Sequence, residues 1–92
     1  MQKLSREEMM EWIENHMRFV RETEYFNGAK GGIWLAADNQ DTYNGDVIYE
    51  YHSQDRKNRT FGVLNKWESE LKNRGWWSEW QDAGTICLYP ND

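Results

Sequence analysis

The chain is best understood from one C-terminal stretch, Arg74-Gly75-Trp76-Trp77-Ser78-Glu79-Trp80-Gln81-Asp82-Ala83-Gly84-Thr85-Ile86-Cys87-Leu88-Tyr89-Pro90. This stretch holds three of the six tryptophans, the single cysteine and the single proline of the 92-residue chain. Residues 76–81 and 85–89 are rich in aromatic and β-branched side chains, which favour strands. The segment between them has the length of a hairpin loop. We therefore predict two strands, at residues 76–81 and 85–89, with Pro90 ending the second.

The N-terminal segment has the pattern of an amphipathic helix. Ser5 followed by Glu8 is a capping box, in which each side chain bonds a backbone N–H of the other residue's turn. Behind it, apolar side chains and His16 recur at helical spacing as far as Val20, while charged side chains fill the opposite half of the helix. We predict a helix over residues 5–23.

The central region predicts a hairpin. Residues 33–37 are apolar, and residues 47–52 are rich in β-branched and aromatic side chains, so both are expected to be strands. Between them lies Asn44-Gly45, the pair favoured in type I′ hairpin turns. The two strands are therefore expected to pair in antiparallel orientation.

A second helix is predicted between Thr60 and Gly75. Phe61, Leu64, Trp67 and Leu71 fall on one helical face. Thr60 is expected to cap its N-terminus, and Gly75 stands where a C-terminal glycine ends a helix.

The resulting order is helix, strand, strand, helix, strand, strand. Short connections favour antiparallel pairing of neighbouring strands. We predict an α+β two-layer sandwich in which an antiparallel four-stranded sheet carries two helices on one face. A chain of 92 residues is expected to form one domain, residues 1–92, because two separate cores would each be small.

One sheet face should then lack a helical cover. Trp76 and Trp77 are adjacent, so in a regular strand they point to opposite faces. The open face should carry Trp34, one member of the Trp76/Trp77 pair, and Tyr89. Exposed aromatic groups of this kind mark a binding surface, unless long loops or a second copy of the chain in a homodimer cover them.

The charge pattern restricts the class of partner. The net charge of −5 argues against general binding of nucleic acid, because phosphate attraction needs an excess of Lys and Arg. No basic residue lies between Lys30 and Arg56, a segment that carries five acids, and the following segment is mainly basic. Such segregated charge can steer partners of opposite charge, and the alternative is a solvated surface whose signs differ by chance. The acids are Asp38, Asp41, Asp46, Glu50 and Asp55.

Material for catalysis is sparse. His52 and Asp55 are candidates for a catalytic pair, although no nucleophile or second acid accompanies them. His16 fits a core position, and Cys87 fits a packed thiol. No spacing typical of a metal site is present, and no cofactor is expected.

The lone cysteine excludes an internal disulfide, and the longest apolar run, residues 33–37, is far shorter than the ~20 residues that span a bilayer. We expect a cytoplasmic protein. The favoured interpretation is a small acidic protein-interaction domain without enzymatic activity, of the kind used by inhibitors, immunity proteins and antitoxins against basic proteins that handle nucleic acid. Its expected binding residues are Trp34, Trp76, Trp77, Tyr89, Asp38, Asp41, Asp46 and Glu50. The alternatives are a small-molecule sensor with an aromatic pocket and an enzyme using His52 and Asp55.

Overall fold

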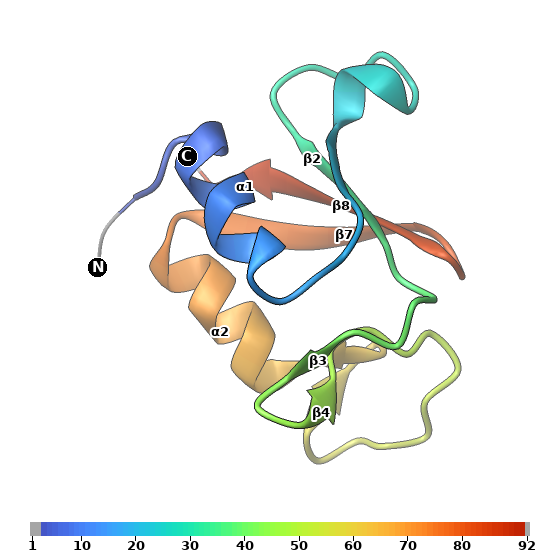
Figure 1. The fold of residues 1–92 in the computed structure, drawn as a ribbon. Coiled ribbons are helices and arrows are strands. Elements are labelled where there is room, and N and C mark those ends of the chain that lie inside the picture. The colour runs from blue at the N-terminus through green and yellow to red at the C-terminus, as the bar shows by residue number, and fades with distance from the viewer. Residues whose placement is uncertain (1–2, 92) are drawn as a thin grey trace.

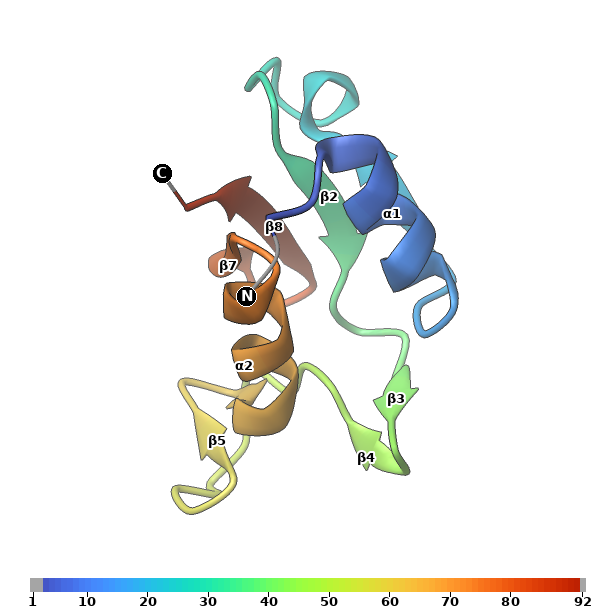
Figure 2. The same cartoon turned by 90° about the vertical axis from the view of Figure 1, so that its left-hand side faces the viewer.

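The structure is a computed structural model that describes residues 3–91 and shows an α+β fold (Figure 1). Helix α1 spans Arg6–Glu14 and helix α2 spans Asn65–Asn73. One antiparallel sheet has the spatial order β1 (Val20–Glu22), β2 (Ile33–Ala36), β8 (Thr85–Pro90) and β7 (Trp76–Asp82). Both helices lie on the same side of this sheet (Figure 2). The predicted fold class is confirmed.

Two short ladders and a single turn of 3₁₀ helix complete the described elements. Strands β3 (Thr42–Tyr43) and β4 (Asp46–Val47) form one ladder, and β5 (Arg59–Thr60) and β6 (Val63–Leu64) form the other. The 3₁₀ turn η1 spans Thr23–Tyr25. Over residues 3–91, neither helix has the length and apolar character needed to cross a bilayer.

Helix α1 begins at the predicted capping box. The Ser5 side chain accepts a hydrogen bond from the backbone N–H of Glu8 at 3.2 Å, and the backbone N–H of Ser5 donates to Glu8 Oε1 at 2.9 Å. One face of the helix then buries Met9 and Ile13 completely. The capping box therefore sets both the start of α1 and the face that meets the sheet.

The predicted extension of this helix to residue 23 is wrong, because α1 ends at Glu14 and the chain continues into β1. Strand β1 pairs with β2, with Val20 opposite Leu35. Val20 is 3% exposed, while Phe19 and Arg21 lie on the other sheet face by alternation. Pairing with β2 satisfies the backbone of this segment and still buries Val20, so tertiary structure overrides the helical pattern.

Strand β2 is confirmed, but its predicted hairpin with residues 47–52 is wrong. Its neighbours are β1 and β8. Ile48 and Tyr49 are consecutive and both buried, whereas a regular strand points consecutive side chains to opposite faces. The Asn44-Gly45 turn does form, with φ of 53° and 88° as a type I′ turn requires, and it closes the short β3–β4 ladder.

Tyr49 connects this irregular segment to the core. Its hydroxyl accepts a hydrogen bond from Trp67 Nε1 at 2.8 Å and bonds Ser78 Oγ at 3.0 Å. Burial raises the pKa of Tyr49 far above its ordinary value, so the phenol stays neutral. One side chain thus joins the loop after β4 to α2 and β7.

Helix α2 starts later than predicted. The β5–β6 hairpin occupies residues 59–64, and its turn is Phe61-Gly62, with φ of 50° and 79°. Leu64 is the N-cap and has no side-chain capping bond, so the predicted cap at Thr60 is wrong. Thr60 instead donates from Oγ1 to Asn65 Oδ1 at 2.7 Å. The predicted end is confirmed, because Gly75 adopts φ of 85° directly after the C-cap Arg74.

The closing hairpin of β7 and β8 is confirmed and forms half of the sheet. Its helix-facing side chains join those of β2 and of both helices in one core. The fully buried members from these elements are Ile33, Leu35, Ile86, Leu88, Met9, Ile13, Trp67 and Leu71.

Candidate functional site

The sheet has one face that is turned away from the helices, which we call the open face. Strand register puts Trp34 opposite Cys87 and Cys87 opposite Glu79, in a row that crosses three strands. Trp77 lies opposite Tyr89 in the next row. Trp34, Trp77 and Tyr89 therefore share the open face, as the alternation predicts.

Trp76 lies on the other face of β7 and belongs to the core. It is 2% exposed, and its Nε1 donates to the carbonyl of Leu4 at 3.0 Å. Its inclusion among the expected binding residues is corrected, because a buried ring that closes the N-terminal segment onto β7 is not available to a partner.

Further aromatic side chains extend the open face beyond β1. Phe19 and Phe26 flank Trp34, with ring centroids 4.9 Å and 5.1 Å from it. The Arg21 guanidinium lies over Phe19, 4.8 Å from the ring centroid. Tyr25 projects into solvent and is 76% exposed. Together with Trp34 and Arg21, Phe19 and Tyr25 line a hollow of about 410 Å³.

The second aromatic pair of the open face depends on a glycine. Trp77 and Tyr89 are tilted against each other, with ring centroids 5.9 Å apart. Tyr89 also covers Gly32, where an added Cβ would lie 2.7 Å from Tyr89 Cε1 and 2.9 Å from the Leu88 carbonyl oxygen. No larger residue fits at position 32 without displacing the tyrosine, so Gly32 fixes how Tyr89 lies on the sheet.

Cys87 occupies the middle of the open face but is fully buried beneath its neighbours. Burial raises the pKa of the Cys87 thiol, and the charges of Glu79 and Asp82 raise it further. The thiol therefore stays protonated and is a poor nucleophile. Glu79 and Asp82 also provide negative charge beside the open face.

The four acids expected to bind a partner do not gather in one place. Asp41 forms an ion pair with Arg18 at 3.0 Å, and its side chain is 7% exposed. Asp46 lies in β4, and Glu50 is joined to the β5–β6 turn through Gly62. Of the four, Asp38 alone reaches the end of the main sheet, where its carboxylate lies against the β7–β8 turn at Gly84.

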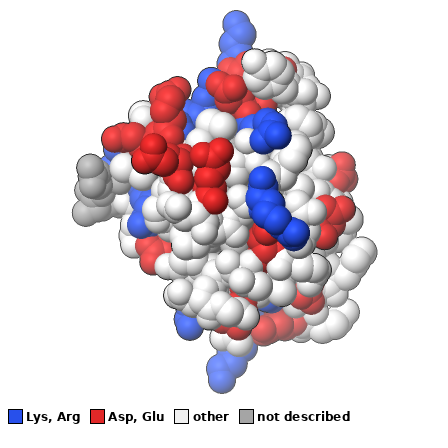
Figure 3. Space-filling model, viewed as in Figure 1, with Lys and Arg blue, Asp and Glu red and all other residues white. Residues whose placement is uncertain are grey.

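A denser acidic region lies elsewhere. Figure 3 shows acidic side chains gathered over α1, on the side of the molecule that carries the helices. The exposed glutamates of this helix are Glu7, Glu8, Glu11 and Glu14. Helical spacing predicts that Glu7, Glu11 and Glu14 lie on the outer half of the helix. The acids predicted to bind a partner are instead those of residues 38–50.

The two residues of the weak catalytic hypothesis are not connected. Asp55 accepts backbone hydrogen bonds from Lys57 at 2.9 Å and Asn58 at 3.0 Å. These bonds, that from Asn58 first, lower the pKa of Asp55. His52 is exposed and contacts the Tyr51 ring, with centroids 5.1 Å apart. No hydrogen bond or ion pair between described residues joins His52 to Asp55.

His16 lies among aromatic rings at the end of α1. Its ring centroid is 5.1 Å from Trp12, 5.2 Å from Tyr43 and 5.7 Å from Trp67. This is the packed environment expected for a core histidine. Across the described part of the chain, no three His, Cys, Asp or Glu side chains are arranged to hold a metal ion.

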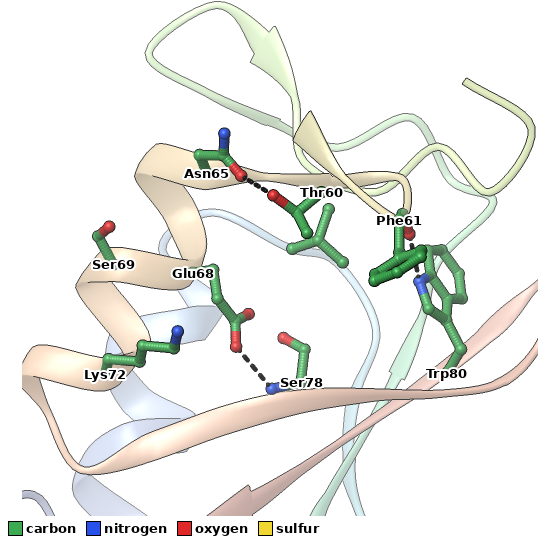
Figure 4. A pocket seen from close by; sticks show the side chains of 9 residues that line it. Thr60, Phe61, Asn65, Glu68, Ser69, Lys72, Ser78 and Trp80 are labelled. Atoms are coloured by element: carbon green, nitrogen blue, oxygen red, sulfur yellow. Dashed lines mark hydrogen bonds between the residues drawn. The ribbon is translucent and has the colours of Figure 1, made fainter. Parts of the chain in front are cut away.

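A second concave site, which we call the cleft, lies between α2, β7 and the β5–β6 turn (Figure 4). Its volume is about 380 Å³, and its lining includes Phe61, Glu68, Lys72, Ser78 and Trp80. The sequence pattern does not predict this site, because Phe61 fits the apolar face of the second helix.

No protein-family model, curated protein or solved structure matches this chain. The open face and the cleft are therefore the features of the molecule that point to a function.

Proposed function

We propose that this protein is a non-enzymatic interaction domain that binds a basic protein through the open face of its sheet. The observation that carries the proposal is the pair of half-buried aromatic groups on the sheet face without a helix, one around Trp34 and one formed by Trp77 and Tyr89. Tryptophan and tyrosine are enriched among the residues that dominate binding energy at protein interfaces. Their large rings also bury much area with little loss of side-chain entropy.

The charge at the β7–β8 end of the open face, away from Arg21, supports a basic partner. Glu79 and Asp82 act on the buried Cys87 from this face, and Asp38 lies beside the same turn as Asp82. The whole chain carries a net charge of −5. Negative potential at the rim of an aromatic surface favours a partner that presents Lys and Arg around an apolar centre.

The finer proposal is an inhibitory role of the kind found in immunity proteins and antitoxins. A protein that handles nucleic acid presents a basic surface to phosphates. Carboxylates at the rim of the open face would occupy that surface, and the aromatic rings would fill the grooves between its basic side chains. Such a contact would block access of nucleic acid without any chemical step.

The test compares two open-face variants with a matched aromatic control. Partners captured from extract are identified by mass spectrometry, and the Kd of each purified partner is then measured by calorimetry. Trp34→Ser and Trp77→Ser should each weaken binding by about 30-fold, the effect of removing an interface anchor. Tyr51→Ser, an exposed aromatic outside the open face, should change Kd less than threefold, which is about 0.6 kcal/mol.

Circular dichroism and thermal melting verify that each variant is folded. If folded Trp34→Ser and Trp77→Ser bind with unchanged Kd, the open face is not the interface. Raising the salt concentration separately tests the charge argument, because screening should weaken a contact between an acidic rim and a basic partner. Affinity that does not vary with salt would contradict the basic partner.

A further inference from the structure

The cleft is built from three separate parts of the chain. Helix α2 contributes Glu68 and Lys72, strand β7 contributes Ser78 and Trp80, and the β5–β6 turn contributes Phe61. Figure 4 shows Glu68 directed into the space between α2 and β7, with the rings of Phe61 and Trp80 at one end. The cleft thus combines a carboxylate with an aromatic wall.

The Glu68 carboxylate is only half satisfied. Its Oε2 accepts a hydrogen bond from the backbone N–H of Ser78 at 3.1 Å. Its Oε1 is buried and has no hydrogen-bond partner among the described residues. A buried carboxylate oxygen without a donor is unfavourable, so this site is suited to a ligand that donates a hydrogen bond and carries positive charge.

The aromatic end of the cleft is held in place by the turn. Trp80 Nε1 donates to the carbonyl of Phe61 at 2.7 Å. Phe61 is 85% exposed. Its backbone occupies the left-handed region, at φ of 50°. Aromatic rings near a carboxylate accommodate the hydrocarbon stem and the charged head of a lysine side chain.

The floor of the cleft is an unpaired strand edge. Strand β7 is the last strand of the sheet and pairs only with β8. The N–H of Ser78 points away from β8, because it bonds Glu68. Backbone direction alternates along a strand, so the backbone groups of Trp80 also point outward. Because the Ser78 N–H is taken by Glu68, an added strand would pair with the outward backbone groups of Trp80 and with the carbonyl of Ser78.

We propose that the cleft is a docking site for an extended, lysine-containing peptide segment of another protein. The segment adds a strand to the outer edge of β7 and places its lysine along Phe61 and Trp80. The ammonium group pairs with the Glu68 carboxylate, which must turn to expose the buried Oε1. This inference goes beyond the open-face proposal, since the cleft is on the helix-bearing side of the sheet and uses none of the open-face residues.

Lys72 allows the proposal to be tested by the direction in which affinity changes. It lines the same cleft and lies one helical turn after Glu68. Its positive charge opposes an incoming cation, although its exposure to solvent weakens the repulsion. Neutralising Glu68 and neutralising Lys72 should therefore change affinity in opposite directions.

The test uses a pentapeptide of threonine, valine, lysine, valine and threonine that is labelled with fluorescein at one end and chemically blocked at the other. Fluorescence anisotropy measures its Kd for the full chain at low salt. Glu68→Gln retains an acceptor for Ser78 and should weaken binding at least about tenfold, as loss of a charge-assisted hydrogen bond implies. Lys72→Gln should strengthen binding about twofold, and Trp34→Ser should leave it unchanged.

Three matched measurements complete the test. A peptide with norleucine in place of lysine should bind at least about tenfold more weakly, since it lacks the ammonium donor. Phe61→Asn keeps the turn and should also weaken binding. Amide resonances of Ser78 and Trp80 should shift when the lysine peptide is added. Failure of Trp34→Ser to affect this peptide separates the cleft from the open face.

Several outcomes would overturn the proposal. Equal Kd values for wild type and folded Glu68→Gln would remove the carboxylate from the site. Equal Kd values for the lysine and norleucine peptides would show that the ammonium group does not contribute to binding. If butylammonium chloride displaced the peptide at the concentration at which the peptide itself binds, the cleft would hold a small cation and no added strand.

Discussion

Phe61 occupies a backbone conformation that suits asparagine or glycine better than phenylalanine. The chain contains a direct comparison, because Asn44-Gly45 and Phe61-Gly62 both form turns with two positive φ values of similar size. For an ordinary L-residue the left-handed region is unfavourable by about 1–2 kcal/mol. Backbone strain of this kind concentrates at functional sites, which agrees with the position of Phe61 at the mouth of the cleft.

Phe61→Asn should therefore stabilise the fold, raising the free energy of unfolding by about 1 kcal/mol. The ring is almost fully exposed, so its removal sacrifices little packing. Urea denaturation followed by tryptophan fluorescence measures the change. A destabilised variant would show that the phenylalanine ring contributes more to the turn than its backbone strain removes.

Two polar contacts of Glu70 make the stability of the fold depend on pH in the acid range. Arg74 donates to Glu70 Oε1 at 2.7 Å, and the Tyr43 hydroxyl donates to Oε2 at 2.9 Å. The Arg74 bond first, and then that from Tyr43, lower the pKa of Glu70 below its ordinary value of 4.5. A carboxyl group with a lowered folded-state pKa stabilises the fold above its unfolded pKa and loses that contribution as pH falls through the folded pKa.

Glu70→Gln should therefore be less stable than wild type at neutral pH, and the difference should shrink as pH falls below 4.5. Urea midpoints measured for both proteins from neutral to acidic pH give this difference directly. A gap that stays constant across the acid range would show that the ionised carboxylate is not the source of the stability.

At the level of elements, the helix start is the feature with the clearest local cause. Ser5→Ala removes the side-chain acceptor of the Glu8 N–H and should lower the free energy of unfolding by about 1 kcal/mol. Glu8→Gln is the matched control, because glutamine also completes a capping box. Thermal melting of the three proteins is sufficient. Equal losses in both variants would mean that the charge of Glu8 contributes as much to the helix start as the Ser5 acceptor.

Elements with local signals could be predicted from the sequence. The capping box, the Asn44-Gly45 turn, Gly75 and the closing hairpin all depend on residues that are neighbours in the chain. Strand β1 could not be predicted in this way, because its register pairs Val20 with Leu35. The spacing of apolar residues up to Val20 fits a helix equally well, and only contact with β2 decides between the two.

The residues of the candidate site differ in the same way: some have a local sequence signal and others depend on distant contacts. Adjacent tryptophans at positions 76 and 77 predict that one of them lies on the open face, and the register identifies Trp77. Phe19 and Phe26 were missed, because residues 5–23 fit a helix and the fold of residues 24–32 brings Phe26 beside Trp34. The cleft is not predicted for a similar reason. It lies between α2, β7 and the β5–β6 turn, and the sequence pattern places the residues of that turn inside the helix.

At the level of the whole molecule, the open face and the cleft lie on opposite sides of one sheet. Residues without shared contacts usually have additive effects on stability, within about 0.5 kcal/mol. The double variant Trp34→Ser/Glu68→Gln should therefore lose the sum of the two single losses in free energy of unfolding. Denaturant titration of the four proteins checks this. A larger discrepancy would show that the sheet transmits changes between its faces.

The free edge of β7 has a consequence for the protein at high concentration. Unpaired strand edges promote aggregation, because one copy can extend the sheet of the next. Here the Ser78 N–H is already engaged by Glu68, and two copies meeting edge to edge would bring their Glu68 carboxylates toward each other. Identical chains are repelled at the contact where a lysine would be attracted. We therefore expect the carboxylate of Glu68 to oppose self-assembly into a continuous sheet.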